Sequence, residues 1–564
     1  MKKVFFLVFF MVLFLCKNHA EIYPVPNHFK LYDFSDEIDN NSLLLKNYVG
    51  RLRPEIMNNY LQLVNGGRAT NHNNAVIFPD VIDDKSEIEH YSFNLYISRG
   101  GEGAGFALLN TDFLVSEDES YDELFQNSKD NGSFSWESPN FKGSFGLGID
   151  VHNPQTSHWF DEWGNFYGRE EREISLHWDN KEIFKMMSPI EFRASPMGSE
   201  INTFDLTIKY ITAGALISLA IQDSFIIDKY FIPEMTQYDK QPIFGASTVD
   251  LTSTVILERF SFLTEGVAPE FSLLDSVVLL EGGVFHSLMQ NMTLNVYFPE
   301  LISNADKVIM TLDLSGPEGG VSDWDVGASI YLTDENGTRF EILRYITPYR
   351  RPYVWKVDVS HFLPLFQGYK DITAYISTWE PVTEDPTEQK GWKVTTWLDF
   401  YQGPTEFRAF AVENLWSGNF EYGNPEEPMK DMFQEYQIEI PEDTKSAIFR
   451  IVTTGHGMSP NYENAAEFRP ADRWVFINGD EYHNLLWKTD NYLNPCRPQD
   501  GTWKFDRAGW APGDVVHAWE INLDKYIEDG VLNLSYLPDD YVNHNRGETW
   551  EPFHKIEAQV IFKK

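Results

Sequence analysis

The chain has 564 residues, enough for roughly three or four domains that each bury a core. It carries 85 Asp and Glu against 45 Lys and Arg, so nucleic-acid phosphates and anionic lipid surfaces would repel it, and nucleic acid is not an expected partner. Aromatic residues make up 15% of the chain and include 16 Trp, a content typical either of surfaces that stack on sugar rings or of large aromatic cores.

The N-terminus has the pattern of an export signal. Lys2 and Lys3 precede an apolar run over 4–15, which is shorter than the roughly 20 residues of a membrane-spanning helix. We expect residues 1–20 to be cleaved and the mature protein to reach the periplasm, the outer-membrane surface or the medium of a bacterium. Cys16 leaves a lipid anchor open as an alternative.

Residues 21–270 are predicted to form one mostly β domain with a single early helix. After Pro54, apolar residues recur at helical spacing up to Gly66, which predicts one amphipathic helix. Alternating apolar residues over 91–97, 174–178 and 204–210 then predict strands of an antiparallel sandwich. The glycine cluster at 100–105 is expected to be a loop, because it lacks the lysine and the following helix of a phosphate-binding site.

Two further blocks, 276–403 and 406–564, also alternate as antiparallel β-sandwiches. The predicted strands are 294–298, 307–314, 328–332 and 394–400 in the first block, and 436–440, 448–452, 474–477, 531–537 and 556–562 in the second. The sequence Gln402-Gly403-Pro404 separates the blocks. The fold class is therefore all-β, and we expect a groove between the two sandwiches.

The candidate chemistry lies in an acidic, aromatic loop before the strand at 328–332, where Asp323 and Asp325 flank Trp324. The sequence has no motif of a serine hydrolase, a zinc protease or a nucleotide-binding enzyme, and no ligand set for a catalytic metal. His456 is interpreted as a hydrogen-bonding loop residue rather than a base. Carboxylates with aromatic neighbours remain, which is consistent with a carboxylate hydrolase or with a lectin.

The motifs of residues 276–564 resemble, in order, those of the peptide:N-glycosidase F family, bacterial amidases that release N-glycans from asparagine. They are Asp323-Trp324-Asp325, Arg344 to Tyr349, Thr378-Trp379, Gly455-His456, Ala466-Glu467 and Asp506 to Trp510. The resemblance implies two eight-stranded jelly-roll-like sandwiches with the active site between them. It also implies that residues 21–270 are the bowl-like N-terminal domain of the larger family members, which would extend the substrate platform or support the sandwiches; an aromatic loop at 157–163 could reach a ligand.

The resemblance also implies roles for single residues. Asp325 falls on the family's indispensable aspartate and Glu467 on its assisting glutamate, while Arg507 is the nearest cation for a developing oxyanion. Alternatively, Arg507 only pairs with Asp506 in a turn. The residues expected to contact the sugar are Trp324, Trp379, Trp510, His456 and Ser377. The expected substrates are N-glycoproteins and glycopeptides, with no cofactor, no metal and a monomeric protein.

The chain departs from the family pattern in several ways, which include Ala511 in place of a Cys and Val326 in place of a basic residue. Cys496 is the only cysteine after the signal, so no disulfide within the mature chain is expected. Ser377 stands where the family's prototype has a glutamate beside the Asn-linked GlcNAc. The smaller serine predicts room for a core α1,3-fucose, unless another acid such as Glu380 takes the glutamate's place. Two other functions stay open: a glycan-binding protein without catalysis, and a glycosidase that uses Asp325 and Glu467 as its acid pair.

Overall fold

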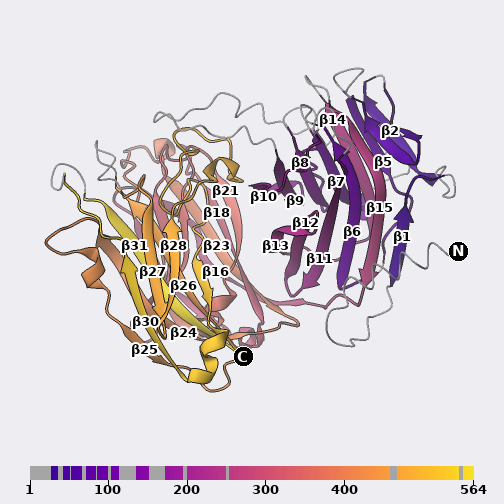
Figure 1. The fold of residues 1–564 in the computed structure, drawn as a ribbon. Coiled ribbons are helices and arrows are strands. Elements are labelled where there is room, and N and C mark those ends of the chain that lie inside the picture. The colour runs from indigo at the N-terminus through magenta and orange to yellow at the C-terminus, as the bar shows by residue number, and fades with distance from the viewer. Residues whose placement is uncertain are drawn as a thin grey trace.

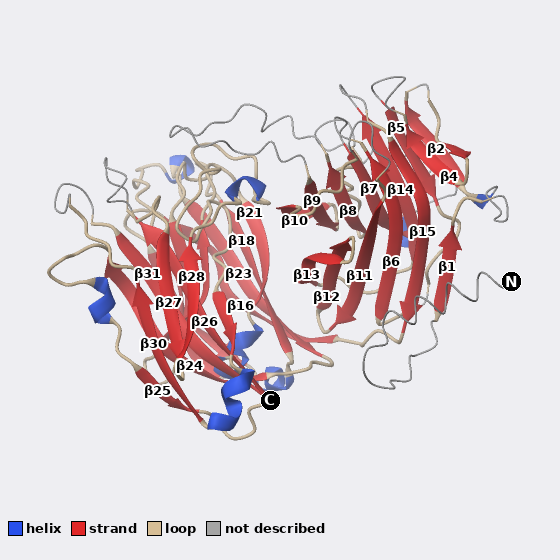
Figure 2. Ribbon diagram, in the orientation of Figure 1, coloured by secondary structure: helices blue, strands red, loops and turns tan. Residues whose placement is uncertain are grey.

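The structure is a computed structural model that describes residues 27–35, 42–50, 52–65, 72–83, 85–98, 103–113, 135–151, 172–194, 200–248, 253–457, 466–544 and 551–564. The expected export signal and the loop at 157–163 lie outside the described residues. In the described part the chain is all β, as predicted, and its strands form six antiparallel sheets that pair into three sandwiches (Figures 1 and 2). No described helix is long and apolar enough to cross a membrane.

Helical structure in the described residues consists of short 3-10 segments. Their bounds are η2 Thr111–Phe113, η3 Glu300–Asn304, η4 Ser360–Leu365, η5 Pro386–Glu388, η6 Met429–Met432, η8 Asn491–Leu493 and η9 Asp524–Asp529.

The N-terminal sandwich packs an eight-stranded sheet on a seven-stranded one. The first sheet has the order β13 (Ser224–Pro233), β12 (Gly214–Ile221), β11 (Asn202–Ile211), β6 (Ile88–Ile97), β15 (Val255–Glu265), β4 (Tyr60–Val64) and β3 (Glu55–Met57), with β1 (His28–Tyr32) beside β15. The second has the order β10 (Lys181–Met187), β9 (Glu173–Trp178), β8 (Phe145–Asp150), β7 (Gly103–Asn110), β14 (Lys240–Thr248), β5 (His72–Ile77) and β2 (Leu44–Val49).

Alternation along β6 builds the core of this sandwich, as predicted. Its inward residues are Tyr91, Phe93, Leu95 and Ile97, all buried. Phe93 meets Phe244 of the opposite sheet with ring centroids 5.4 Å apart. Because every second side chain of β6 is buried, its aromatic rings meet those of the opposite sheet in one core.

The predicted early helix is wrong, because the segment after Pro54 is a β-hairpin. Strands β3 and β4 pair with Met57 opposite Tyr60. Asn58 and Asn59 connect them with positive φ of 51° and 64°, as a type I′ hairpin turn requires. Asparagine tolerates this left-handed conformation, so the Asn-Asn pair and not the spacing of apolar residues decides the local structure.

The expected glycine loop is also wrong in part, because Gly103 and Gly105 lie inside β7. A Cβ on Gly105 would lie 2.0 Å from the backbone oxygen of Trp136, and a Cβ on its cross-strand partner Gly245 would lie 2.0 Å from the Trp136 ring. These glycines let the segment around Trp136 cover the outer face of the seven-stranded sheet, where it builds a second apolar layer.

The middle and C-terminal sandwiches each pack two four-stranded sheets. The middle sandwich has the orders β16 (Ser272–Phe285), β23 (Trp392–Gln402), β18 (Lys307–Ser315), β21 (Tyr353–Asp358) and β17 (Asn291–Phe298), β22 (Gly368–Ile376), β19 (Gly327–Thr333), β20 (Arg339–Ile346). The C-terminal sandwich has the orders β24 (Ala409–Glu421), β31 (Phe553–Lys563), β26 (Ser446–His456), β29 (Trp519–Asn522) and β25 (Tyr436–Glu439), β30 (Val531–Pro538), β27 (Ala471–Ile477), β28 (Asp480–Leu486).

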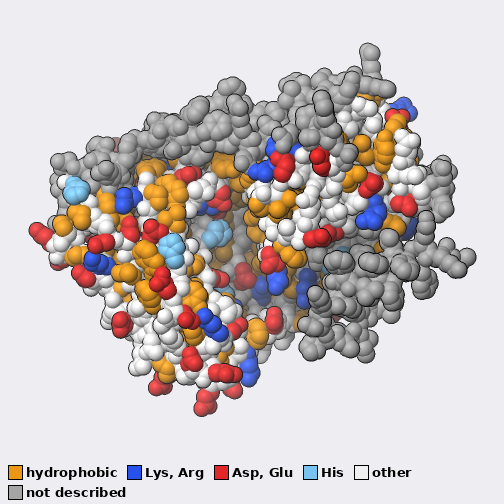
Figure 3. Space-filling view, in the orientation of Figure 1, with side chains coloured by type: hydrophobic (Ala, Val, Ile, Leu, Met, Phe, Trp, Pro, Cys, Tyr) orange, Lys and Arg blue, Asp and Glu red, His pale blue; other side chains and the backbone are white. Residues whose placement is uncertain are grey.

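These two sandwiches are jelly-roll-like and lie side by side, and the N-terminal sandwich flanks the middle one (Figure 1). In the space-filling view the surface is hollowed between the N-terminal sandwich and the other two (Figure 3). Loops at one end of the middle and C-terminal sandwiches bring together the acidic residues singled out from the sequence.

Candidate active site

The loop before β19 holds Asp325 in a fixed place. Thr347 is buried, and its hydroxyl donates to the backbone oxygen of Trp324 at 2.9 Å and accepts from the backbone N–H of Val326 at 2.9 Å. The backbone N–H of Thr347 donates in turn to the oxygen of Val326 at 3.0 Å. One threonine therefore clamps the chain on both sides of Asp325.

Arg507 joins the two candidate acids, which come from different sandwiches. Its side chain is fully buried, its Nε donates to Glu467 Oε1 at 3.1 Å, and its Nη2 lies 3.6 Å from Asp325 Oδ2. The side chains of Asp325 and Glu467 remain 12% and 19% exposed. A ligand can therefore still reach both carboxyl groups, while the cation behind them is sealed from solvent.

This arrangement raises the pKa of both carboxyl groups. Burial raises the pKa of Glu467 from 4.5 to about 7; the charge of Arg507 counteracts part of this effect, and the nearby Asp325 adds to it. Burial likewise raises the pKa of Asp325, against the opposing effects of Arg507 and a hydrogen bond from Tyr349. Paired acids with perturbed pKa values in reach of solvent are typical of catalytic sites.

The contacts of Arg507 favour a positioning role over contact with an oxyanion. Its Nη1 donates to the oxygens of Thr502 and Phe505 at 2.8 and 3.1 Å, and its Nη2 donates to the Thr502 hydroxyl at 2.8 Å. Every guanidinium nitrogen thus already has a protein acceptor. The alternative in which Arg507 only pairs with Asp506 in its turn does not account for its contacts with Glu467 and Asp325.

Tyr349 is a site residue that the sequence reasoning missed. Its hydroxyl is hydrogen-bonded to the Asp325 carboxyl group and lies 3.1 Å from the Thr502 hydroxyl, so it links the middle sandwich to the segment that holds Arg507. Tyr349 ends the Arg344-to-Tyr349 motif, which was the only available signal. No local pattern shows that its hydroxyl meets Asp325 of the middle sandwich and Thr502 of the C-terminal block.

Two of the three predicted aromatic wall residues are open to solvent. Trp324 and Trp379 are each 50% exposed, and their ring centroids lie 6.0 Å apart. Trp510 differs from the prediction, because it is 4% exposed and its indole N–H donates to the oxygen of Gly455 at 2.8 Å. Its ring lies 4.7 Å from the Arg507 guanidinium, so it supports the arginine and does not form a wall.

His456 and Ser377 lie close to the same loop. His456 stacks on Trp510 at 5.5 Å and is hydrogen-bonded to the Thr454 hydroxyl at 2.8 Å, and burial lowers its pKa to about 3. Ser377 is half-buried, and its backbone N–H donates to the oxygen of Gly327 at 3.0 Å. Ser377 therefore lies next to Gly327, the first residue of β19, and Gly327 follows Asp325 by two positions in the chain.

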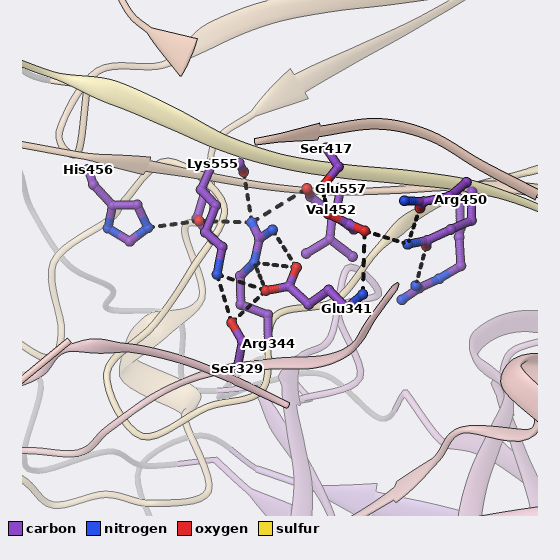
Figure 4. A network of polar contacts seen from close by, with 12 residues as sticks. Ser329, Glu341, Arg344, Ser417, Arg450, Val452, His456, Lys555 and Glu557 are labelled. Atoms are coloured by element: carbon purple, nitrogen blue, oxygen red, sulfur yellow. Dashed lines mark hydrogen bonds and ion pairs between the residues drawn. The ribbon is translucent and has the colours of Figure 1, made fainter. Parts of the chain in front are cut away.

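A buried polar network joins the middle and C-terminal sandwiches (Figure 4). Arg344 of β20 pairs with Glu341 and donates to the Lys555 oxygen of β31 at 2.7 Å. Lys555 Nζ reaches back to Glu341 at 2.8 Å and to Ser329 at 2.7 Å. Arg344 also donates to Thr454, the partner of His456, at 3.1 Å. The network therefore continues from the sandwich interface to the aromatic residues beneath Arg507.

Among the residues that the structure describes, no group of three or more His, Cys, Asp or Glu could hold a metal ion. Cys496 is free and buried.

Comparisons with known proteins find similar sequences and structures. Residues 425–549 match the family model for the C-terminal domain of peptide-N-glycosidase F. Peptide-N(4)-(N-acetyl-beta-D-glucosaminyl)asparagine amidase F of Elizabethkingia miricola is 25% identical over 282 residues, which cover 47% of this chain and 76% of that protein. The chain is thus similar to members of the peptide-N-glycosidase F family.

Two solved structures are also similar to the chain. One is a crystal structure of peptide-N(4)-(N-acetyl-beta-D-glucosaminyl)asparagine amidase at 2.2 Å resolution, and the other is PNGase F, a glycosylasparaginase from Flavobacterium meningosepticum. Each is 21% identical with a TM-score of 0.45, over 52% of this chain and 96% of its own. The peptide-N-glycosidase F family match at 425–549 includes Glu467 and Arg507, which the structure places beside Asp325.

Proposed function

We propose that this protein is a peptide:N-glycosidase that hydrolyses the side-chain amide between asparagine and the first GlcNAc of an N-glycan. The observation that carries the proposal is that one buried guanidinium holds Asp325 and Glu467 at the rim of the sandwich interface. Trp324 lies on the Asp325 loop and Trp379 on the loop after β22, and this exposed pair offers faces for sugar rings. The products are an intact glycan and an aspartate in the peptide.

The two acids divide the proton transfers between them. Asp325, the acid of lower usual pKa and with two stabilising partners, takes the proton from the attacking water. Glu467, with a pKa of about 7, is protonated in a large fraction of molecules at neutral pH, and this form gives its proton to the departing glycosylamine nitrogen. Arg507 and Tyr349 hold the acids in place for these transfers.

The test is digestion of a defined glycopeptide in water enriched in ¹⁸O, followed by mass spectrometry of both products. An amidase leaves an aspartate that carries ¹⁸O and a glycan that retains its first GlcNAc. A peptide that keeps a single GlcNAc would instead indicate a glycosidase. Binding of the glycopeptide without any product would indicate a lectin, and either outcome contradicts the proposal.

We further propose that the site accepts glycans with a core α1,3-fucose. Ser377 brings no carboxylate next to Gly327 and Trp379. Glu380, the acid that could replace a missing glutamate, is buried and accepts from the Ser322 hydroxyl at 2.6 Å and from the Asp323 N–H at 3.3 Å. Because these bonds hold the Asp325 loop, Glu380 is not free to fill the space beside the first sugar.

Paired glycopeptides that differ only in the α1,3-fucose test this specificity. We expect release from both, and we expect Ser377→Glu to abolish release from the fucosylated peptide alone. Ser377→Ala is the matched control and should keep both activities, because it adds no volume. If the unaltered enzyme releases only the unfucosylated glycan, the specificity proposal fails while the amidase proposal stands.

A further inference from the structure

The N-terminal sandwich makes two kinds of contact with the rest of the protein. The first is a docking contact on the middle sandwich, where Glu234 pairs with Lys356 and accepts from the Tyr401 hydroxyl at 3.0 Å. An apolar cluster of Ala213, Ile309 and Tyr401 lies beside it. These contacts lie on β18, β21 and β23 of the middle sandwich and include none of the candidate active-site residues.

The second contact reaches the C-terminal sandwich. Arg497 Nη2 donates to Glu182 Oε1 of β10 at 2.5 Å, and both side chains are more than four-fifths buried. Burial alone would raise the pKa of Glu182, but the charges of Arg497, Lys185 and His177 hold that pKa below its usual value. Glu182 is therefore charged at neutral pH, so this contact is a partly desolvated ion pair.

Glu182 is held firmly on its own side of the contact. Strand β10 has an irregularity between Glu182 and Phe184. The Tyr230 hydroxyl donates to the oxygen of Ile183 at 3.0 Å, and the rings of Phe184 and Tyr230 lie 4.6 Å apart. The bulge and the tyrosine together fix the backbone from which Glu182 meets Arg497.

Arg497 belongs to the segment that carries Arg507, which we call the arginine loop (residues 491–513). Arg497 Nη1 donates to the oxygens of Leu493 and Asn494 at 2.9 and 3.0 Å and so closes the 3-10 turn at the start of this loop. Asn491 in that turn donates to the oxygens of Phe505 and Trp510 at 2.7 and 3.1 Å.

The oxygen of Phe505 also accepts from Arg507 Nη1 at 3.1 Å. A continuous chain of contacts therefore leads from Glu182 through Arg497 and Asn491 to Arg507. A second branch passes through Gln499, which accepts from the backbone N–H of Tyr349 at 3.0 Å and donates to the oxygen of Pro512 at 2.8 Å. The two side chains at the Asp325 carboxyl group, Arg507 and Tyr349, thus both depend on the geometry of the arginine loop.

We propose that Glu182 of the N-terminal sandwich is a positioning residue for the active site, because its ion pair with Arg497 holds the arginine loop in the geometry that places Arg507 between Asp325 and Glu467. The inference rests on the proposed amidase function. It gives the N-terminal sandwich a role in catalysis without contact to the substrate.

Glu182→Ala in the full-length protein tests the proposal, with Glu234→Gln as the matched control. Both changes remove an ion pair of the N-terminal sandwich, but only Glu182 contacts the arginine loop. We expect Glu182→Ala to speed amide hydrogen exchange within 491–513 and to lower kcat by about 10- to 100-fold, since small displacements of catalytic groups have effects of this size. KM should change less than kcat. Glu182→Asp, which keeps the charge, should recover part of the loss.

Each alternative outcome has its own signature. Unchanged exchange and unchanged kcat in Glu182→Ala would refute the positioning role. Equal losses in both variants would show that general docking of the N-terminal sandwich is responsible, and a rise in KM alone would point to substrate binding; both contradict the proposal. Hydrogen exchange is measured without substrate, so it judges the loop contact even if the protein proves not to be an amidase.

Discussion

At the scale of single residues, the site depends on one cation that holds two acids. Arg507 is fully buried and contacts both Asp325 and Glu467, and its own position is set by Thr502, Phe505 and Trp510. A buried guanidinium of this kind must be paired, because an unpaired buried charge is strongly unfavourable. The acids therefore stabilise the arginine, and the arginine orients the acids.

We expect Asp325→Asn to lower kcat/KM by about 10²- to 10⁴-fold, the usual contribution of a positioned base, because an amide cannot take a proton from water. Glu467→Gln should lower it less, since the base remains. The measurement is glycan release under steady-state conditions, with thermal unfolding to show that each variant is folded. An Asp325→Asn enzyme that keeps most of its activity would refute the assignment.

The pKa of Glu467 predicts how activity depends on pH. A proton donor with a pKa of about 7 loses its proton as the pH rises, so kcat/KM should fall above that pH. Glu467→Gln should remove this alkaline fall and leave the fall at acidic pH, where Asp325 becomes protonated. A wild-type profile that stays flat through neutral and mildly alkaline pH would contradict the proton-donor role.

The same pKa predicts an effect on stability. Because the native pKa is raised above the unfolded value of 4.5, native Glu467 binds more protons than unfolded Glu467 between these two values, and the free energy of unfolding falls as the pH rises through this window. Glu467→Gln should therefore stabilise the protein by on the order of 1–3 kcal/mol above pH 7 and have little effect near pH 4. Chemical denaturation at both pH values measures the difference.

At the scale of elements, short local signals compete with hydrophobic spacing. The apolar residues after Pro54 have helical spacing, yet Asn58 and Asn59 adopt left-handed backbone conformations and turn the segment into the hairpin of β3 and β4. Strand β4 of the hairpin also pairs with β15, so its backbone N–H and C=O groups find hydrogen-bond partners in the sheet. A strong turn signal in the middle of a helical pattern therefore has priority.

Substitutions in this turn test the explanation. Asn59→Ile should destabilise the protein by about 1–2 kcal/mol, because a β-branched residue is unfavourable at a φ of 64°. Asn59→Gly is the control and should be close to neutral, since glycine adopts this conformation freely. Chemical denaturation compares the free energies of unfolding, and equal stability of the two variants would rule out the turn as the deciding feature.

At the scale of the whole molecule, three sandwiches share contacts that converge on one site. The interface between the middle and C-terminal sandwiches contains the ion pairs of Glu341, Arg344 and Lys555. Burial acts to raise the pKa of Glu341, but the positive charges of Arg344 and Lys555 hold this pKa well below its usual value. Such a network fixes how the sandwiches meet, and with it the distance between Asp325 and Glu467.

Arg344→Ala should destabilise the protein by roughly 3–5 kcal/mol, because it leaves part of a buried carboxylate uncompensated. Lys525→Ala, which breaks an exposed pair with Asp480, is the control and should have a much smaller effect. Thermal unfolding measures both. A small effect of Arg344→Ala would mean that the apolar contacts at the interface suffice to hold the sandwiches together.

The all-β fold class and the residue types of the site follow from the order of residues along the chain. Burial alternates along strands with period two, so strands such as β6 and β11 were visible in the order of apolar residues. The motifs around Asp325, Glu467 and Arg507 could also be recognised, because each is a short, continuous segment.

What these residues do together depends on how distant parts of the chain pack. Asp325 and Arg507 are far apart in the chain, and their contact depends on how two sandwiches pack, which no local pattern encodes. The same holds for Tyr349, which gains its role by facing Asp325, and for Trp510, which packing buries under Arg507 instead of leaving it open to a sugar. Local structure follows from residues that are neighbours in the chain. The burial of a side chain, its pKa and the groups that it contacts follow from residues that are distant in the chain.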